Sequence, residues 1–271
     1  MSLFKLSKSN IAVINPLFEN ITDTLVLSCL QGYMGQAWTD DLVAPQSAQI
    51  ITADFCFFAG KPNAELVNHC PESYDSNSII MIPGNDSWAA LIEKNYEGRA
   101  GKFTRYAIKP KTSPFDIPLL NQYISQIPPS YQLKRFDSDL YNQSKLNSWS
   151  EDFCSQFDSY DLFNKYGLGV AVTCEDKLVA GASSYTIFDK GIEIEVDTQF
   201  DHRRKGLALA CSAKLILECL EKNIYPNWDA ANLASVALAE KLGYEFSHEY
   251  AAYEITDFDN HKKSSSAASS L

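Results

Sequence analysis

The chain has 271 residues, of which 45% are hydrophobic and 21% are charged, so it can bury a substantial core and is not disordered over most of its length. Asp and Glu number 34 against 23 Lys and Arg, which gives a net charge of −11. A surface this acidic disfavours general binding to nucleic acid or to an anionic membrane, whereas it attracts a cationic ligand such as an amine.

The seven cysteines indicate a reducing compartment. Their number is odd, none belongs to a Cys-x-x-Cys pair, and Cys29, Cys56, Cys174, Cys211 and Cys219 lie in apolar or strand-like runs. This pattern favours buried free thiols over a disulfide framework or a zinc site. Since the sequence also shows neither a signal-peptide pattern nor an apolar run of about 18 residues, we expect a cytoplasmic protein without a metal ion.

Local patterns in the first half predict short helices and strands. Asn15-Pro16 is typical of a helix start, and apolar residues follow at helical spacing until Gly32. A β-rich run covers 48–59, Asn85 precedes a short helix, 102–109 alternates as a strand, and 114–127 contains another helix.

Tandem Pro128-Pro129 is the sharpest break in the chain, because two prolines continue neither a helix nor a strand. We therefore expect an N-terminal α/β domain at 1–128 and a second domain at 129–260. The Ser-rich tail at 261–271 has low complexity and is expected to be disordered.

The second half alternates between strands and helices more regularly. Strands are predicted at 131–136, 168–174, 178–187, 192–198, 225–229 and 244–255, and the clearest helices at 206–222 and 232–242. A helix starts at Asp137, and two short helices are expected within 149–166. The order predicts an α/β (α+β) fold with one mixed sheet flanked by helices.

The strand at 192–198 carries three carboxylates on one face. Ile192, Ile194 and Val196 alternate with Glu193, Glu195 and Asp197. Repulsion among three neighbouring carboxylates favours the protonated form of one of them, which suits a general base that works near neutral pH. Glu195 is the first choice for this base, with Glu193 and Asp197 as the alternatives. If the carboxylates have no catalytic role, the pattern instead indicates an exposed, charged face of a strand.

A basic segment lies between this strand and the long helix that follows. Its residues are Arg203, Arg204, Lys205, Gly206, Leu207 and Ala208. A helix start presents backbone N–H groups and partial positive charge, and small residues at positions 206 and 208 let an anion approach the main chain. The segment has neither the P-loop nor the dinucleotide-binding pattern, so we interpret it as a different pyrophosphate cradle.

Two motifs in this half resemble those of the GCN5-related N-acetyltransferases (GNAT). Arg203, Gly206 and Ala208 match the acetyl-CoA signature Arg/Gln-x-x-Gly-x-Gly/Ala, and the segment from Asn232 to Tyr244 matches Asn-x-x-Ala-x-x-Leu-Tyr-x-Lys-x-Gly-Phe in spacing. The resemblance covers about 131–255. Runs such as 54–60 and 105–109 are similar to the zwittermicin-resistance-like branch, which extends the resemblance over nearly the whole chain except the tail.

The resemblance implies a GNAT-type acyl-CoA N-acyltransferase fold in the second domain, with a mixed, mostly antiparallel sheet. It implies a bulge in the strand before the signature, backbone contacts from Val196 and Thr198 to the acetyl group and the pantetheine arm, and contacts of Asn232 and Ser235 with CoA. The position of the family's usual Tyr general acid holds Ala239. Tyr250, on the last predicted strand, is the substitute candidate.

The expected activity is transfer of an acetyl group from acetyl-CoA to a primary amine of a small molecule, by direct attack in a ternary complex. An aminopolyol antibiotic is one acceptor that fits. A CoA-binding sensor or structural module without catalysis is the alternative, favoured by Ala239. The N-terminal domain is expected to shape the acceptor site through Trp38, Asp40, Asp41 and Asp54; a homodimer is left open.

Overall fold

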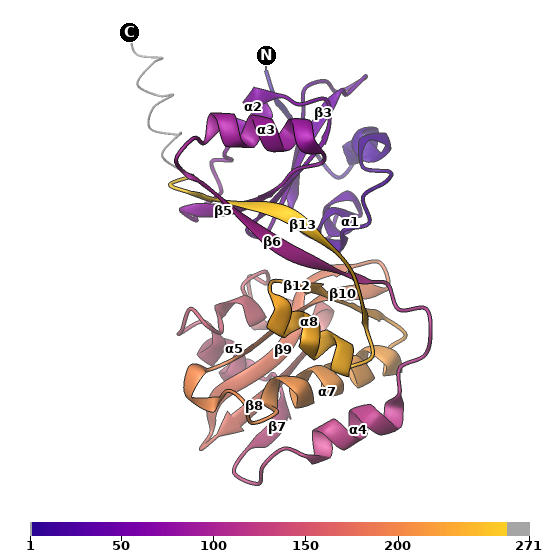
Figure 1. Cartoon of the computed structure of the whole chain (residues 1–271), viewed down its shortest axis with the longest axis vertical. Helices are drawn as coiled ribbons and strands as arrows, with labels where there is room; N and C mark the ends of the chain where they lie inside the picture. Colours follow the sequence, from indigo (N-terminus) through magenta and orange to yellow (C-terminus); the bar gives the residue numbers. More distant parts are fainter. Residues whose placement is uncertain (1, 259–271) are drawn as a thin grey trace. The chain divides into compact units, whose positions relative to one another are not determined.

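Two long strands, β6 (Ala100–Lys109) and β13 (Glu245–Thr256), each run from one unit of the protein into a second one (Figure 1). The computed structural model describes residues 2–258. The first unit comprises residues up to Arg105 together with the segment from Tyr250, and the second comprises Tyr106–Glu249. The expected tail at 261–271 lies outside the described residues.

In the first unit, the strands follow the order β1-β2-β3-β4-β5-β13. Their bounds are β1 Phe4–Lys5, β2 Gln36–Thr39, β3 Ser47–Thr52, β4 Phe55–Gly60 and β5 Ser78–Ile82. The helices are the 3₁₀ helix η1 Ile11–Leu17, α1 Thr24–Leu30, α2 Ala64–Asn68 and α3 Asp86–Asn95. Strand β13 joins this unit through pairing of Tyr253–Thr256 with the antiparallel β5.

Two expectations for the first unit are corrected by the structure. The β-rich run at 48–59 is a hairpin of β3 and β4, because the backbone turns at Ala53, whose φ is 56°. The helix expected from Asn15-Pro16 is the short 3₁₀ helix η1, with Pro16 inside it. The α-helix begins later, at Thr24, where the Asp23 side chain accepts the Leu25 N–H.

The second unit contains a sheet with the order β11-β10-β9-β8-β7. These strands are β7 Gln132–Arg135, β8 Gly169–Cys174, β9 Lys177–Phe188, β10 Gly191–Thr198 and β11 Tyr225–Asn227, and β12 Asp229–Ala230 pairs with β6 instead. The helices are α4 Ile117–Ser125, α5 Ser138–Ser144, η2 Glu151–Phe153, α6 Tyr160–Tyr166, η3 Phe200–His202, α7 Leu207–Glu221 and α8 Leu233–Lys241.

Both faces of this sheet are covered, as the alternation along β9 shows. Ala180 and Ala182 belong to the hydrophobic core on the side of α7, where α4 packs along α7 (Figure 1). Gly181 and Ser183 point the other way, toward η2: the Ser183 hydroxyl donates to the Phe153 carbonyl, and a Cβ at position 181 would lie 2.9 Å from the Phe153 ring. Small residues on β9 therefore let helices approach the sheet on both sides.

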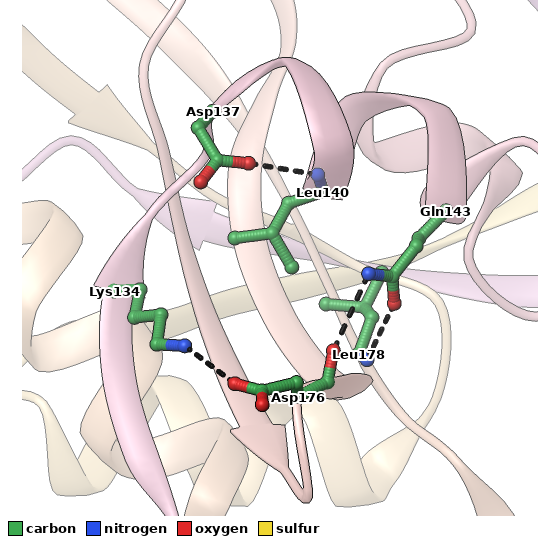
Figure 2. A network of polar contacts seen from close by, with 6 residues as sticks. All are labelled: Lys134, Asp137, Leu140, Gln143, Asp176 and Leu178. Carbon is green, nitrogen blue, oxygen red and sulfur yellow. Dashed lines mark hydrogen bonds and ion pairs between the residues drawn. The ribbon is translucent and has the colours of Figure 1, made fainter.

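A polar network holds α5 against the turn between β8 and β9 (Figure 2). The Gln143 amide donates to the Asp176 carbonyl over 3.3 Å and accepts the Leu178 N–H over 2.9 Å. The Asp176 carboxylate forms an ion pair with Lys134 of β7, and Asp137 caps α5 at its N-terminus. Gln143 thus supplies both a donor and an acceptor to backbone groups at the β8–β9 turn.

The units do not follow the division expected at 128/129. Helix α4 packs on α7, so the chain before Pro128 already belongs to the second unit. All seven thiols are free within residues 2–258; five are buried, whereas Cys70 and Cys174, the latter expected to be buried, are partly exposed. Burial raises the pKa of the Cys29 thiol to about 12 and also raises that of Cys211.

Candidate active site at strand β10 and helix α7

Strand β10 loses its neighbour on one side halfway along its length. It pairs with β9 from Gly191 to Thr198, but with the parallel strand β11 only over Gly191, Ile192 and Glu193. After β11 the chain passes into β12, which pairs with β6. Among the described residues, no strand therefore pairs with the second half of β10 on that side, and its backbone groups form an open edge.

The bulge expected in β10 lies in β9 instead. The register between the two strands shifts between Glu193 and Ile194, where the additional residue is Tyr185 of β9. Strand β10 itself keeps its alternation, so the predicted division into an apolar and an acidic face is confirmed. Ile192, Ile194 and Val196 belong to or pack against the hydrophobic core beside α7, and the three carboxylates lie on the opposite face.

Glu193 is buried where β11 separates from β10. One carboxylate oxygen accepts the Asn227 side-chain amide over 2.6 Å, and the other accepts the Asp229 backbone N–H over 2.9 Å. Only 4% of Glu193 is exposed. A buried carboxylate with two donors stabilises the local backbone, so Glu193 holds the point from which β11 and β12 diverge.

Asp197 connects the end of β10 to the basic loop. Its carboxylate forms an ion pair with Arg203 over 3.3 Å and accepts the Thr198 N–H over 2.6 Å. The Arg203 guanidinium also donates to the Thr198 carbonyl over 2.9 Å. Arg203 is thus fixed against the strand. Glu195, between the two engaged carboxylates, is partly exposed.

The backbone before α7 forms an uncapped helix start that is open to the outside. Gly206 occupies the N-cap position with a φ of 76°, and no side chain caps the helix. A Cβ built at Gly206 would meet no atom within 4 Å. Leu207 is buried and anchors the first turn, whereas Ala208 is partly exposed. Because the first N–H groups of a helix have no intrahelical acceptor, this turn fits the pyrophosphate of a CoA molecule.

Lys205 and Arg204 complete this loop. Arg204 is exposed and has a φ of 62°. The Lys205 ammonium donates to the Tyr131 hydroxyl over 2.9 Å and to the Asp201 carbonyl over 3.1 Å. The same hydroxyl lies 3.0 Å from Nδ1 of His202. The sequence did not predict Tyr131 or His202 as site residues, because neither occupies a position of a recognised motif.

Asn232 has a structural role at the start of α8. Its side chain accepts the Ser235 N–H over 3.0 Å, as an N-cap does. The Ser235 hydroxyl accepts the indole N–H of Trp228, which is 2% exposed and packs in the core. Thr198, another residue expected to contact the cofactor, is buried, and its hydroxyl oxygen has no hydrogen-bond partner within residues 2–258. Ala239, at the usual Tyr position, is completely buried.

Several of the candidate residues belong to the first unit, whereas β10 belongs to the second. Tyr250 belongs to the first unit, where its hydroxyl accepts from Arg105 over 3.3 Å. In the same unit, Trp38 is a buried core residue of β2. Asp40 and Asp41 accept backbone N–H groups of the turn after that strand, and these bonds lower the pKa of Asp41.

Within residues 2–258, no three His, Cys, Asp or Glu side chains gather in a way that could hold a metal ion. No helix in this part of the chain is long and apolar enough to cross a bilayer.

The open strand edge and the uncapped helix start are the geometry expected of an acetyltransferase of the GNAT type, and comparisons with known proteins show that family. The family model described as GNAT acetyltransferase matches residues 15–253. The chain is 26% identical to the N-acetyltransferase YdfB of Bacillus subtilis over 264 residues, which cover 93% of this chain and 98% of that protein.

Solved structures show the same fold. A GCN5-related N-acetyltransferase-like protein from Streptococcus suis is 40% identical, with a TM-score of 0.85 over 91% of this chain and 98% of that one. A GCN5-related N-acetyltransferase from Sphaerobacter thermophilus has a TM-score of 0.55 at 11% identity, over 94% of this chain and 95% of that chain, and supports the fold alone. The chain belongs to the GNAT acetyltransferase family.

Proposed function

We propose that this acetyltransferase moves an acetyl group from acetyl-CoA to a primary amine of a small molecule by direct attack in a ternary complex. The proposal rests on two neighbouring features, the open edge of β10 and the uncapped start of α7, which are joined by a short connection in the chain. The open edge suits an extended pantetheine arm, and the helix start suits its pyrophosphate.

The residues of the donor site divide into three groups. Backbone groups of Val196 face the thioester end of the site. The N–H and carbonyl of Thr198 are engaged by Asp197 and Arg203, so Thr198 contributes through its buried hydroxyl, which has no hydrogen-bond partner within residues 2–258. The turn formed by Arg203, Arg204, Lys205, Gly206, Leu207 and Ala208 holds the pyrophosphate. Asn232 and Ser235, at the start of α8, contact the CoA arm in addition to capping that helix.

Glu195 is the proposed general base. Glu193 is buried, and Asp197 fixes Arg203 at the end of β10. Glu195 lies between them and is reached by solvent. It accepts the proton that the amine loses as its nitrogen forms the new C–N bond. The thioester C–S bond then breaks, and the thiolate takes its proton from water, because Ala239, at the position of the family's usual Tyr, has no proton to donate.

The chemistry of the acceptor follows from charge. The net charge of −11 and the acidic face of β10 attract an ammonium group, as expected for a polyamine, an amino sugar or an aminopolyol of the zwittermicin type. We propose that the residues before Pro128 contribute to selectivity for this acceptor.

The decisive experiment measures CoA release and amine acetylation together, by mass spectrometry, with the full-length protein and a panel of amines. We expect amine-dependent turnover that falls roughly 100-fold in Glu195→Gln, the range of general-base loss, while CoA affinity by calorimetry changes less than about threefold. Glu240→Gln, an exposed carboxylate on α8, is the matched control. Absence of CoA binding to the parent contradicts the proposal, and normal turnover of Glu195→Gln contradicts the role of this residue.

A further inference from the structure

The second unit contains a cavity at the opposite end of α7 from Gly206. Its volume is about 300 Å³, and it is lined by the end of β7, the end of α6 with the segment after it, and the end of α7. At a rise of about 1.5 Å per residue, the roughly fifteen residues of α7 place this cavity about 22 Å along the helix from the basic loop. It is therefore separate from the proposed pyrophosphate site.

Arg135 presents an oriented guanidinium at this cavity. Its Nε donates to the Glu218 carboxylate over 2.9 Å, and Glu218 is only 1% exposed. Lys214, one helical turn earlier, also lies 3.7 Å from this carboxylate. Within the described residues, Nε makes the one hydrogen bond of the guanidinium, so both terminal NH₂ groups remain for a ligand. A fork fixed in this way matches the two oxygens of a carboxylate.

Two further cations line the cavity. Neither Lys165 nor Lys222 forms an ion pair among the residues that the structure describes, and both are exposed. Lys165 lies over the Tyr166 ring, 4.7 Å from its centroid. Three cations thus face one buried carboxylate in a protein whose net charge is −11. Glu221 adds a negative charge near Arg135, which leaves a local excess of positive charge.

The remainder of the lining is aromatic or lacks side chains. The Phe136 and Phe163 rings are buried and pack edge to face, 5.8 Å apart. Gly169 lies against both: a Cβ there would come within 2.8 Å of either ring, so this position cannot carry a side chain without displacing them. The cavity therefore combines flat apolar walls with a cationic rim, and its volume is at the small end for ligand pockets.

We propose that this cavity binds a small organic carboxylate with a planar apolar body, at a site separate from acetyl transfer. The carboxylate is held by the Arg135 fork with Lys222 and Lys165 beside it, and the body lies against Phe136 and Phe163. Glu218 has a positioning role, since it directs the guanidinium without touching the ligand.

The test uses three probes that share one body and differ in the head group: phenylacetate, phenylacetamide and phenethylamine. Binding to the full-length protein is followed by ligand-observed NMR titration. We expect phenylacetate to bind at least tenfold more tightly than the neutral amide, and we expect phenethylamine, which the proposed acceptor site also attracts, to bind no differently in variants of Arg135 and Lys222. Equal binding of phenylacetate and phenylacetamide, or weaker amine binding in those variants, overturns the proposal.

Variants then locate the probe. Arg135→Lys keeps the positive charge but loses the two terminal NH₂ groups of the guanidinium. Lys222→Gln disturbs no ion pair and so leaves folding intact. We expect each variant to weaken phenylacetate binding at least threefold. Lys134→Gln is the matched control, because this neighbouring residue of β7 pairs with Asp176 on the other face (Figure 2) and should bind phenylacetate within twofold of the parent. Unchanged binding in both cavity variants overturns the proposal.

A last measurement separates this site from the donor site. Saturating CoA should leave the phenylacetate affinity unchanged, whereas displacement of the probe by CoA would place it in the donor site and contradict the proposal. If CoA itself does not bind, the proposed function fails. The head-group preference and the variants still test whether the cavity binds a carboxylate.

Discussion

A side chain introduced at Gly206 should weaken CoA binding more directly than a substitution elsewhere in the chain. Its φ of 76° and the open space in front of it mean that a new side chain meets no protein atom and projects toward the proposed pyrophosphate. A non-glycine residue in the left-handed region costs about 1–2 kcal/mol, so each substitution also lowers stability by that amount. The informative comparison is therefore between substitutions that share this cost.

Gly206→Glu and Gly206→Gln differ in charge and hardly in size. Two like charges about 6 Å apart repel by about 3 kcal/mol at an effective dielectric constant of about 20, which corresponds to roughly 100-fold in affinity. We expect calorimetry to show CoA binding about 100-fold weaker in the Glu variant than in the Gln variant, with equal melting temperatures for the two. Equal CoA affinities of these variants would refute the assignment of the cradle.

Two further predictions concern stability. Glu193→Gln replaces one acceptor oxygen by an NH₂ group that faces the donor of Asn227 or of Asp229, so the free energy of unfolding should fall by about 1–3 kcal/mol in urea titrations. Glu240→Gln, at an exposed position on α8, should change it by less than about 0.5 kcal/mol. Equal losses in both variants would contradict the structural role of Glu193. Gln143→Ala removes both hydrogen bonds to the β8–β9 turn and should lower the free energy of unfolding by about 1–2 kcal/mol in the same assay. Lys134→Gln removes a surface ion pair alone, and a smaller loss in Gln143→Ala than in this variant would contradict the role of Gln143.

The sequence predicted most elements of the second unit because their periodicity is unambiguous. Apolar and acidic residues alternate along β10 without exception, and α7 begins after Gly206 and ends before Lys222. The order of these elements and the position of the basic loop therefore follow from local patterns. The roles within the acidic face did not follow. Three carboxylates at alternate positions look alike in sequence, whereas only their partners, Asn227 and Asp229 for one and Arg203 for another, tell them apart.

The misplaced elements have local causes. The β3–β4 turn at Ala53 and Asp54 contains neither Gly nor Pro, so the run around it reads as one strand. Asn15-Pro16 has the composition of a helix start, but Asp23 caps the α-helix. Pro128-Pro129 lies in a connection within one unit, and the pairing of β13 with β5 is a long-range contact that no local pattern reports.

The return of the chain through β13 also affects the order in which the protein can fold during its synthesis. Glu254 pairs with Ile80, so the first unit receives its last strand segment only after roughly 170 further residues have been made. At about 5–20 residues per second, the ribosome needs roughly 10–35 s for that stretch. During this interval the edge of β5 that pairs with β13 lacks this partner. The N-terminal unit is therefore the last to be completed, although its first residues emerge first.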